Sequence, residues 1–156
     1  MRADLWAFSL AFYARPGVSP ACLRCQDEAG ADVDLLLFLL WQAQAGAQFS
    51  ADEIAAIDRD VQAWREQVIE PLRAVRRYLK GRKAAGVREA VKAAELAAER
   101  LELDALSRHA RPGAGARREM AASGNLQAYQ AALGRELPRA ALAALLATLA
   151  AGEPLP

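Results

Sequence analysis

The two cysteines of the chain, Cys22 and Cys25, form a C-x-x-C motif, a spacing found in dithiol redox centres and in halves of zinc sites. A redox centre of this kind needs a βαβ context, which the surrounding sequence does not provide. A structural zinc site needs two further ligands, and the chain has one histidine, His109, and no second cysteine pair. We therefore expect both thiols to be buried in the core, and we predict no metal site and no cofactor.

The remaining residues capable of acid–base chemistry show no catalytic spacing. Glu95, Glu99 and Glu102 share one helix face, but a di-iron site would also need Glu-x-x-His pairs on two helices. A solvent-exposed face accounts for these glutamates. The sequence contains neither a Gly-rich phosphate loop nor a G-x-S-x-G nucleophile motif. We therefore assign no catalytic residue and favour a protein that is not an enzyme, with an enzyme that uses carboxylates and arginines as the open alternative.

Charge is distributed unevenly, although the net charge is only +1. Residues 26–70 carry ten acidic and two basic residues, whereas residues 71–92 carry eight basic residues and Glu89 as the one acidic residue. The basic segment can bind the phosphates of a nucleic acid, or it can pair with the acidic segment inside the domain. We favour internal pairing, because Tyr78 is the only aromatic residue in the basic segment that could stack on a base.

The elements that must position these residues are helices. The chain has 156 residues, the size of one domain, and is rich in alanine, the best helix former. The run 35–41 is apolar on every side, which predicts a buried central helix over about 32–45 with Asp32 as its N-cap. We predict an all-α, compact single-domain bundle, 1–156, of six or seven helices.

A long helix is predicted over about 51–80. Ser50 and Glu53 form a capping-box pattern at its start. Apolar residues then recur with steps of three and four along the whole stretch, which is helical periodicity. Pro71 lies inside this pattern, and because the apolar stripe continues in phase beyond it, we expect a kink there and not an end.

The helix that follows is predicted over 87–109, with an apolar stripe formed by Val87, Val91, Ala94, Ala98, Leu101 and Ala105. Residues 110–115 are rich in glycine and contain a proline, and we expect a flexible loop there.

The last part of the chain, residues 116–152, is predicted to form short helices. Gly124 is expected to end the first of them. These helices either pack on the core or form an arm that is swapped in an oligomer. Residues 153–156 form a tail.

The sequence shows no targeting segment. Residues 1–6 lack a basic region followed by a long apolar core, so we expect no signal peptide and a location in the reducing cytoplasm. The apolar run 35–41 is far shorter than the roughly 20 residues that a membrane helix needs. We therefore expect no membrane span.

Two stretches of the chain carry a recognisable pattern. The first runs from Leu5-Trp6 through Pro16-Gly17 and Gln26-Asp27 to Asp32-Val33-Asp34-Leu35, and the second runs from Trp64-Arg65 through Pro71-Leu72-Arg73 and Arg76-Arg77 to Leu79-Lys80. Over about residues 5–110 the chain resembles a bacterial family of uncharacterised all-helical proteins, a domain of unknown function. The resemblance brings no known activity, cofactor or partner.

The polar residues that match this family flank the central helix in sequence and lie among tryptophans. We expect them to form either a buried ion-pair network that fixes the helix register or a pocket for an anionic small molecule, and we favour the network. The candidate ligand-binding residues are Gln26, Asp27, Asp32, Arg73, Arg76, Arg77, Trp6 and Trp41.

Three functions follow as hypotheses. The preferred one is a non-catalytic helical interaction or adaptor protein whose partner is another protein or a second copy of the chain. It predicts an exposed apolar patch and no polar pocket. The alternative is a protein or enzyme that binds an anionic small molecule through arginine and aspartate, and it predicts a concave site with perturbed titratable groups near the tryptophans. Nucleic-acid binding through residues 71–92 is possible and not favoured.

Overall fold

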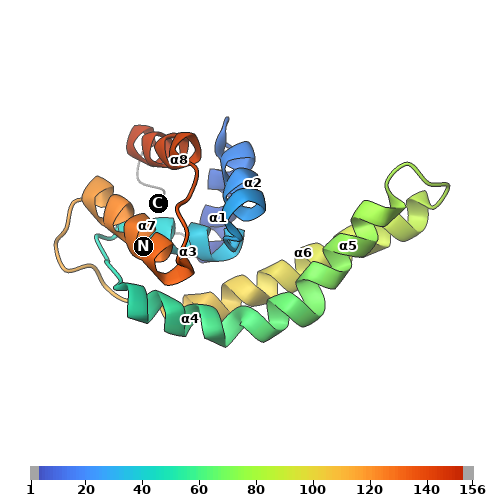
Figure 1. The fold of residues 1–156 in the computed structure, drawn as a ribbon, viewed down its shortest axis with the longest axis horizontal. Helices are drawn as coiled ribbons and strands as arrows, with labels where there is room; N and C mark the ends of the chain where they lie inside the picture. Colours follow the sequence, from blue (N-terminus) through green and yellow to red (C-terminus); the bar gives the residue numbers. More distant parts are fainter. Residues whose placement is uncertain (1–3, 153–156) are drawn as a thin grey trace.

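A computed structural model describes residues 4–152, and within them it contains helices and no strands (Figure 1). This confirms the all-α fold. In chain order the elements are α1 (Leu5–Tyr13), α2 (Val18–Ala29), α3 (Val33–Gln44), α4 (Ala51–Trp64), the π-helical segment η1 (Arg65–Ile69), α5 (Glu70–Leu79), α6 (Ala85–Ser107), α7 (Arg118–Leu133) and α8 (Arg139–Ala151).

The centre of the fold is α3, as the apolar run 35–41 predicts. Every residue of this run is buried. The Asp32 side chain caps the helix by accepting a hydrogen bond from the backbone N–H of Asp34 at 3.2 Å. Helices α1, α6 and α7 pack directly against α3, α4 packs on α7, and α8 packs on α2 and α7. A helix that is apolar on every side is thus covered on every side.

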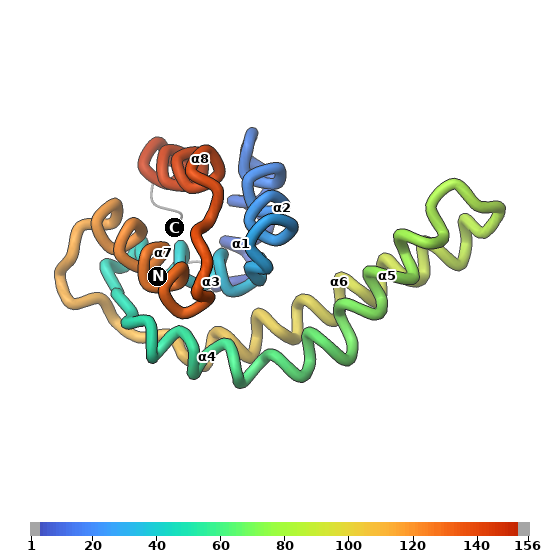
Figure 2. The backbone as a smooth tube through the Cα atoms, viewed as in Figure 1, coloured from blue at the N-terminus to red at the C-terminus, as the bar shows by residue number. Residues whose placement is uncertain are grey.

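The long helix predicted over 51–80 is present as α4, η1 and α5, which follow one another without a break. Its start is confirmed, because Ser50 and Glu53 form the complete capping box. Pro71 does not end the helix. Proline lacks an N–H and its ring crowds the carbonyl four residues earlier, at Gln67, and the wider π turn lies at that point. Figure 2 shows the path of the helix bending between α4 and α5.

Helices α5 and α6 form an antiparallel hairpin whose far end extends away from the other helices (Figure 1). No residue of α5 is buried. The apolar stripe predicted for 87–109 is wrong at Val87 and Leu101, which are exposed, whereas Ala98 of the same stripe is buried. The side of α6 that faces the core contains Ala98, Glu102 and Leu106, which follow one another at intervals of four.

Gly124 does not end a helix, contrary to the prediction, and α7 runs through it as one continuous helix. The next residue, Asn125, is buried and holds the helix against its neighbours. Its Oδ1 accepts a hydrogen bond from the N–H of Phe49 at 2.9 Å. Its Nδ2 donates to the carbonyls of Leu39 at 3.1 Å and Ala47 at 3.0 Å. These tertiary bonds outweigh the small preference of glycine to stop a helix.

The segment between α6 and α7 crosses the end of α3. The Arg111 N–H donates to Oε1 of Gln42 at 2.7 Å, and the Arg111 guanidinium bonds Glu53 at 2.8 Å and lies 4.0 Å from the centre of the Phe49 ring. Among residues 4–152, no helix combines the length and the hydropathy that crossing a bilayer requires. The predicted tail, 153–156, lies outside the described residues.

Candidate functional site

A cavity of about 310 Å³ opens where α5 and α6 leave the body of the molecule and face α1, α2 and the start of α3. Part of its lining is apolar and includes Trp6, Leu10, Tyr13, Leu23 and Leu96. The rest is mainly polar and includes Gln26, Asp34, Arg73, Arg76, Arg77, Glu95 and Glu99. The cavity therefore offers a partly apolar, partly charged environment.

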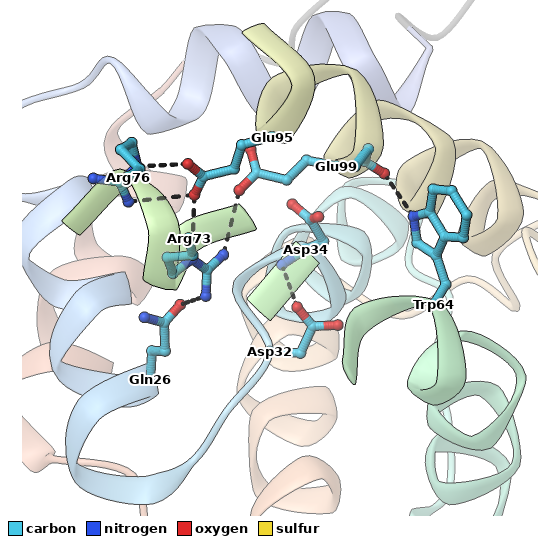
Figure 3. Close-up of polar contacts among 9 residues, drawn as sticks. Gln26, Asp32, Asp34, Trp64, Arg73, Arg76, Glu95 and Glu99 are labelled. Carbon is cyan, nitrogen blue, oxygen red and sulfur yellow. Dashed lines mark hydrogen bonds and ion pairs between the residues drawn. The ribbon is translucent and has the colours of Figure 1, made fainter. Parts of the chain in front are cut away.

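Arg73 joins three helices at the polar wall (Figure 3). Its guanidinium donates to Oε1 of Gln26 on α2 at 2.9 Å, and on α6 it donates to Oε1 of Glu95 and Oε1 of Glu99, each at 3.3 Å. Arg76 donates to Glu95 from the next turn of α5. These arginines find their carboxylate partners on α6 and not in the acidic segment 26–70, so the predicted pairing of the two charged segments is wrong for them.

The glutamates of α6 do not form a solvent-exposed face, contrary to the prediction. Glu95 and Glu102 are buried, and Glu99 is half-buried. Burial alone would raise the pKa of Glu95, but hydrogen bonds from Arg76 and Arg73 outweigh it, and the pKa lies below its usual value. Burial raises the pKa of Glu99, and Arg73 offsets this only in part.

Beside this network lies a buried carboxylate cluster, formed by Asp32, Asp34 and Glu102. One carboxylate oxygen from each residue lies within 4.8 Å of the other two. Burial raises the pKa of Asp34 well above its ordinary value, and the neighbouring charges of Asp32 and Glu99 raise it further. Burial also raises the pKa of Glu102. The hydrogen bond to Asp32 and the negative charge of Asp32 raise it further.

One guanidinium borders the carboxylate cluster directly. Nη1 of Arg65 lies 3.3 Å from Oδ2 of Asp32, and the same guanidinium bonds Asp58 at 2.6 Å. The backbone N–H of Asp32 donates to the hydroxyl oxygen of Tyr129 at 2.8 Å, which fixes the residue at the start of α3. Gln26, Asp32 and Arg73 also line a second cavity, of about 280 Å³, together with Asp58 and Arg65.

The structure brings most of the sequence-predicted site residues together. Six of the eight line the first cavity, namely Trp6, Gln26, Asp32, Arg73, Arg76 and Arg77. Asp27 is exposed on α2 and Trp41 is buried in α3, and neither lines this cavity. Arg77 is exposed, and among residues 4–152 it forms no hydrogen bond and no ion pair.

Sequence reasoning missed Asp34 and the three glutamates of α6. A signal for Glu102 was available, because Ala98, Glu102 and Leu106 are spaced at four-residue intervals. Ala98 and Leu106, which flank Glu102 on this stripe, are small or apolar. A stripe of such residues faces a core, which places Glu102 in the core as well. No comparable signal connects α6 with Asp34, since their proximity depends on how α3 and α6 pack.

The C-x-x-C motif lies in the core, as expected. Cys22 and Cys25 are free and fully buried. Burial raises the pKa of Cys22 to about 12 and that of Cys25 to about 11, so neither thiol is a nucleophile near neutral pH. His109 follows the end of α6, and its Nε2 lies 2.9 Å from Oδ2 of Asp60.

Comparison with known protein families gives a match over most of the chain. Residues 4–106 match a family described as "Protein of unknown function (DUF2390)". This segment spans α1 to the end of α6 and contains all residues of the cavity and of the carboxylate cluster. No curated protein and no solved structure gives a significant match.

Proposed function

Because the chain belongs to the DUF2390 family, whose function is unknown, we propose from the geometry of its cavity that the protein binds a small organic anion with an apolar body. The observation that carries this proposal is the position of Arg77. Arg77 lines the cavity and is exposed, and its guanidinium has no carboxylate partner among residues 4–152. A guanidinium of this kind can bind a carboxylate or phosphate with two parallel hydrogen bonds.

The other charged groups of the wall support an anionic ligand. Arg73 and Arg76 are already paired with Glu95 and Glu99, so these four groups neutralise one another. The raised pKa of Asp34 keeps that carboxyl group protonated over a wider pH range. Asp32, the remaining carboxylate of the lining, is paired with Arg65, so Arg77 provides the charge that the lining leaves unbalanced.

The apolar wall supports a ligand that is more than a bare ion. Leu10, Leu23 and Leu96 line the cavity and are 51%, 41% and 50% exposed. Covering such side chains is favourable, at about 25 cal/mol per Å² of apolar surface. The volume of about 310 Å³ lies at the lower end of the range of pockets that hold drug-sized ligands, about 300–1,000 Å³.

These features favour ligand binding over an adaptor function. An adaptor was expected to have an apolar patch and no polar pocket, whereas a ligand-binding protein was expected to have a concave site with perturbed titratable groups near a tryptophan. The cavity has Trp6 in its wall, beside Asp34 and Glu99 with raised pKa values. Its exposed leucines are the part of the arrangement that a protein partner could also cover.

A titration followed by NMR tests the proposal, with 1-naphthyl phosphate as the anionic probe and 1-naphthol as its uncharged match. The three tryptophan indole signals provide an internal control, because Trp6 lines the cavity and Trp41 and Trp64 do not. We expect 1-naphthyl phosphate to shift the Trp6 signal and to leave the other two unchanged, with a weaker effect of 1-naphthol. Equal shifts of all three signals, or no shift, would contradict the proposal.

A second candidate function is favoured by the far end of the α5–α6 hairpin, which contains Lys80, Arg82, Lys83 and Arg88. Lys80 and Lys83 form no hydrogen bond and no ion pair with any residue in 4–152. The Arg82 guanidinium stacks at 4.0 Å over Tyr78, which is itself exposed and able to stack on a base. This end of the hairpin is therefore a candidate surface for single-stranded nucleic acid.

Fluorescence anisotropy with a mixed-sequence single-stranded oligonucleotide tests the second candidate. We expect binding that weakens steeply between 50 and 200 mM salt, as counterion release requires. The double substitution Lys80→Glu and Lys83→Glu should abolish it, whereas Arg77→Ala should retain most of it. Binding that is insensitive to salt or to the double substitution would exclude this role.

A further inference from the structure

The carboxylate cluster of Asp32, Asp34 and Glu102 is unusual in its burial. All three residues are buried, and they come from two helices that are distant in sequence. Carboxylates rarely occupy such a position unless they are paired, protonated or bound to a cation. The cluster therefore needs a compensating group.

The described residues supply only part of that compensation. Arg65 approaches Asp32 from one side and shares its guanidinium with Asp58. One oxygen of Asp32 accepts the N–H of Asp34. Glu102 is 1% exposed, and its Oε1 has no hydrogen-bond partner among residues 4–152. The three carboxylates and Asp58 beside one guanidinium leave three negative charges when all are ionised.

A second observation comes from a different helix. The Ser9 hydroxyl on α1 is buried, with the residue 4% exposed, and it forms no hydrogen bond within residues 4–152. Ser9 lines the same cavity as Asp32 and Asp34. A buried hydroxyl without a partner is a costly feature, and a water molecule or a ligand in the cavity can satisfy it.

We propose that Asp32, Asp34 and Glu102 bind one hard divalent cation of the Ca²⁺, Mg²⁺ and Mn²⁺ class, with the Ser9 hydroxyl available to a water molecule in its coordination shell. Oxygen ligands without nitrogen or sulfur select cations of this class. Ca²⁺ takes oxygens at about 2.3–2.6 Å, so two ligands on opposite sides of the ion are about 5 Å apart. The three carboxylate oxygens, all within 4.8 Å of one another, fit around such an ion.

Charge balance supports a divalent ion. A divalent cation offsets most of the negative charge that Arg65 leaves uncompensated. The site does not rest on the proposed function, because the cation binds in the absence of an organic ligand. If both are correct, the cation adds positive charge beside the cavity in which the anion binds.

Calorimetric titration of the full-length, chelator-treated protein with Ca²⁺, Mg²⁺ or Mn²⁺ alone tests the proposal. We expect one saturable site for at least one of these ions, together with a rise in melting temperature. Asp34→Asn and Glu102→Gln should each weaken binding at least tenfold. Asp27→Asn, which changes an exposed carboxylate outside the cluster, should leave the affinity unchanged.

Circular dichroism and thermal melting of each variant separate loss of the site from loss of the fold. A folded Glu102→Gln protein with weakened cation binding supports the proposal. Two results would overturn it. The first is wild-type protein that takes up none of the three cations in a saturable manner. The second is wild-type affinity in folded Asp34→Asn and Glu102→Gln proteins, which would place any bound cation elsewhere.

Discussion

Asp34 on α3 and Glu102 on α6 hold carboxylate oxygens within 4.8 Å of each other inside the protein. Each residue belongs to a helix that the hydrophobic core orients, and neither pKa is at its ordinary value. Their proximity places a cluster of acids beside a cavity whose lining is partly apolar. The candidate chemistry of this protein depends on that packing of α3 against α6.

The two arginines of α5 should differ in their contribution to stability. Arg73→Ala removes contacts to Gln26, Glu95 and Glu99, and we expect it to lower the free energy of unfolding by about 1–2 kcal/mol, because the guanidinium is only partly exposed. Arg77→Ala removes no hydrogen bond or ion pair within residues 4–152 and should change the free energy of unfolding by less than about 0.5 kcal/mol. Urea unfolding measures both. Equal losses would contradict the assigned contacts.

Asn125 should be indispensable for the junction between α3 and α7. Asn125→Asp keeps the shape but removes the two donors to Leu39 and Ala47 and introduces a buried charge, so we expect a loss of about 3 kcal/mol or more. Gln127→Glu makes the corresponding change at an exposed position of α7 and should be nearly neutral. Chemical denaturation compares them, and a well-tolerated Asn125→Asp would show that the network is dispensable.

The pH dependence of stability should report the contact between Glu53 and Arg111. The hydrogen bond from Arg111, followed by that from the Ser50 N–H, lowers the pKa of Glu53 to about 2 from its ordinary 4.5. A carboxyl group with a depressed pKa stabilises the folded state above its unfolded pKa, and this contribution is lost as the pH falls from about 4.5 to 2.

Wild-type protein should therefore lose more stability between pH 5 and 2 than the Glu53→Gln variant. Equilibrium unfolding at a series of pH values measures the difference, and Glu136→Gln, at an exposed position, serves as the control. The size of the effect is limited by solvent, because the Arg111 and Glu53 side chains are 40% and 45% exposed. Identical pH profiles for wild type and Glu53→Gln would exclude a stabilising role.

Two glycines should respond in opposite directions to substitution by alanine. A Cβ on Gly113 would overlap the backbone carbonyl oxygen of Ala45, so Gly113→Ala should destabilise the protein by about 1–3 kcal/mol. Gly86 lies in α6 with open space around it, and Gly86→Ala should stabilise the protein by about 0.5–1 kcal/mol. Melting temperatures test the pair. A neutral Gly113→Ala would mean that the 110–117 segment does not pack closely on α3.

The extent to which sequence predicts this molecule differs between the fold and the site. The apolar run 35–41 and the Ser50–Glu53 capping box each depend on residues that are adjacent in sequence. The buried helix and the helix start that they predict are both confirmed. The predicted helix end at Gly124 is wrong, because the hydrogen bonds that hold Asn125 in α7 come from residues far away in sequence.

The same distinction applies to charge. Helical spacing places Glu95, Glu99 and Glu102 on one face, but it does not say whether that face meets water or a neighbouring helix. Only the packing of α6 against α3 and α5 decides this, and it buries two of the three glutamates. The partners of Arg73 and Arg76 could not be predicted for the same reason.

Calorimetric titration with 1-naphthyl phosphate tests the central claim most directly, because it isolates the contribution of Arg77 to anion binding in the cavity. Wild-type protein and Lys80→Ala, which removes a charge outside the cavity, should bind the probe equally well. Arg77→Ala should bind it at least tenfold more weakly, a difference of about 1.4 kcal/mol. Unchanged affinity in Arg77→Ala, or equal affinity of wild-type protein for uncharged 1-naphthol, would contradict the account.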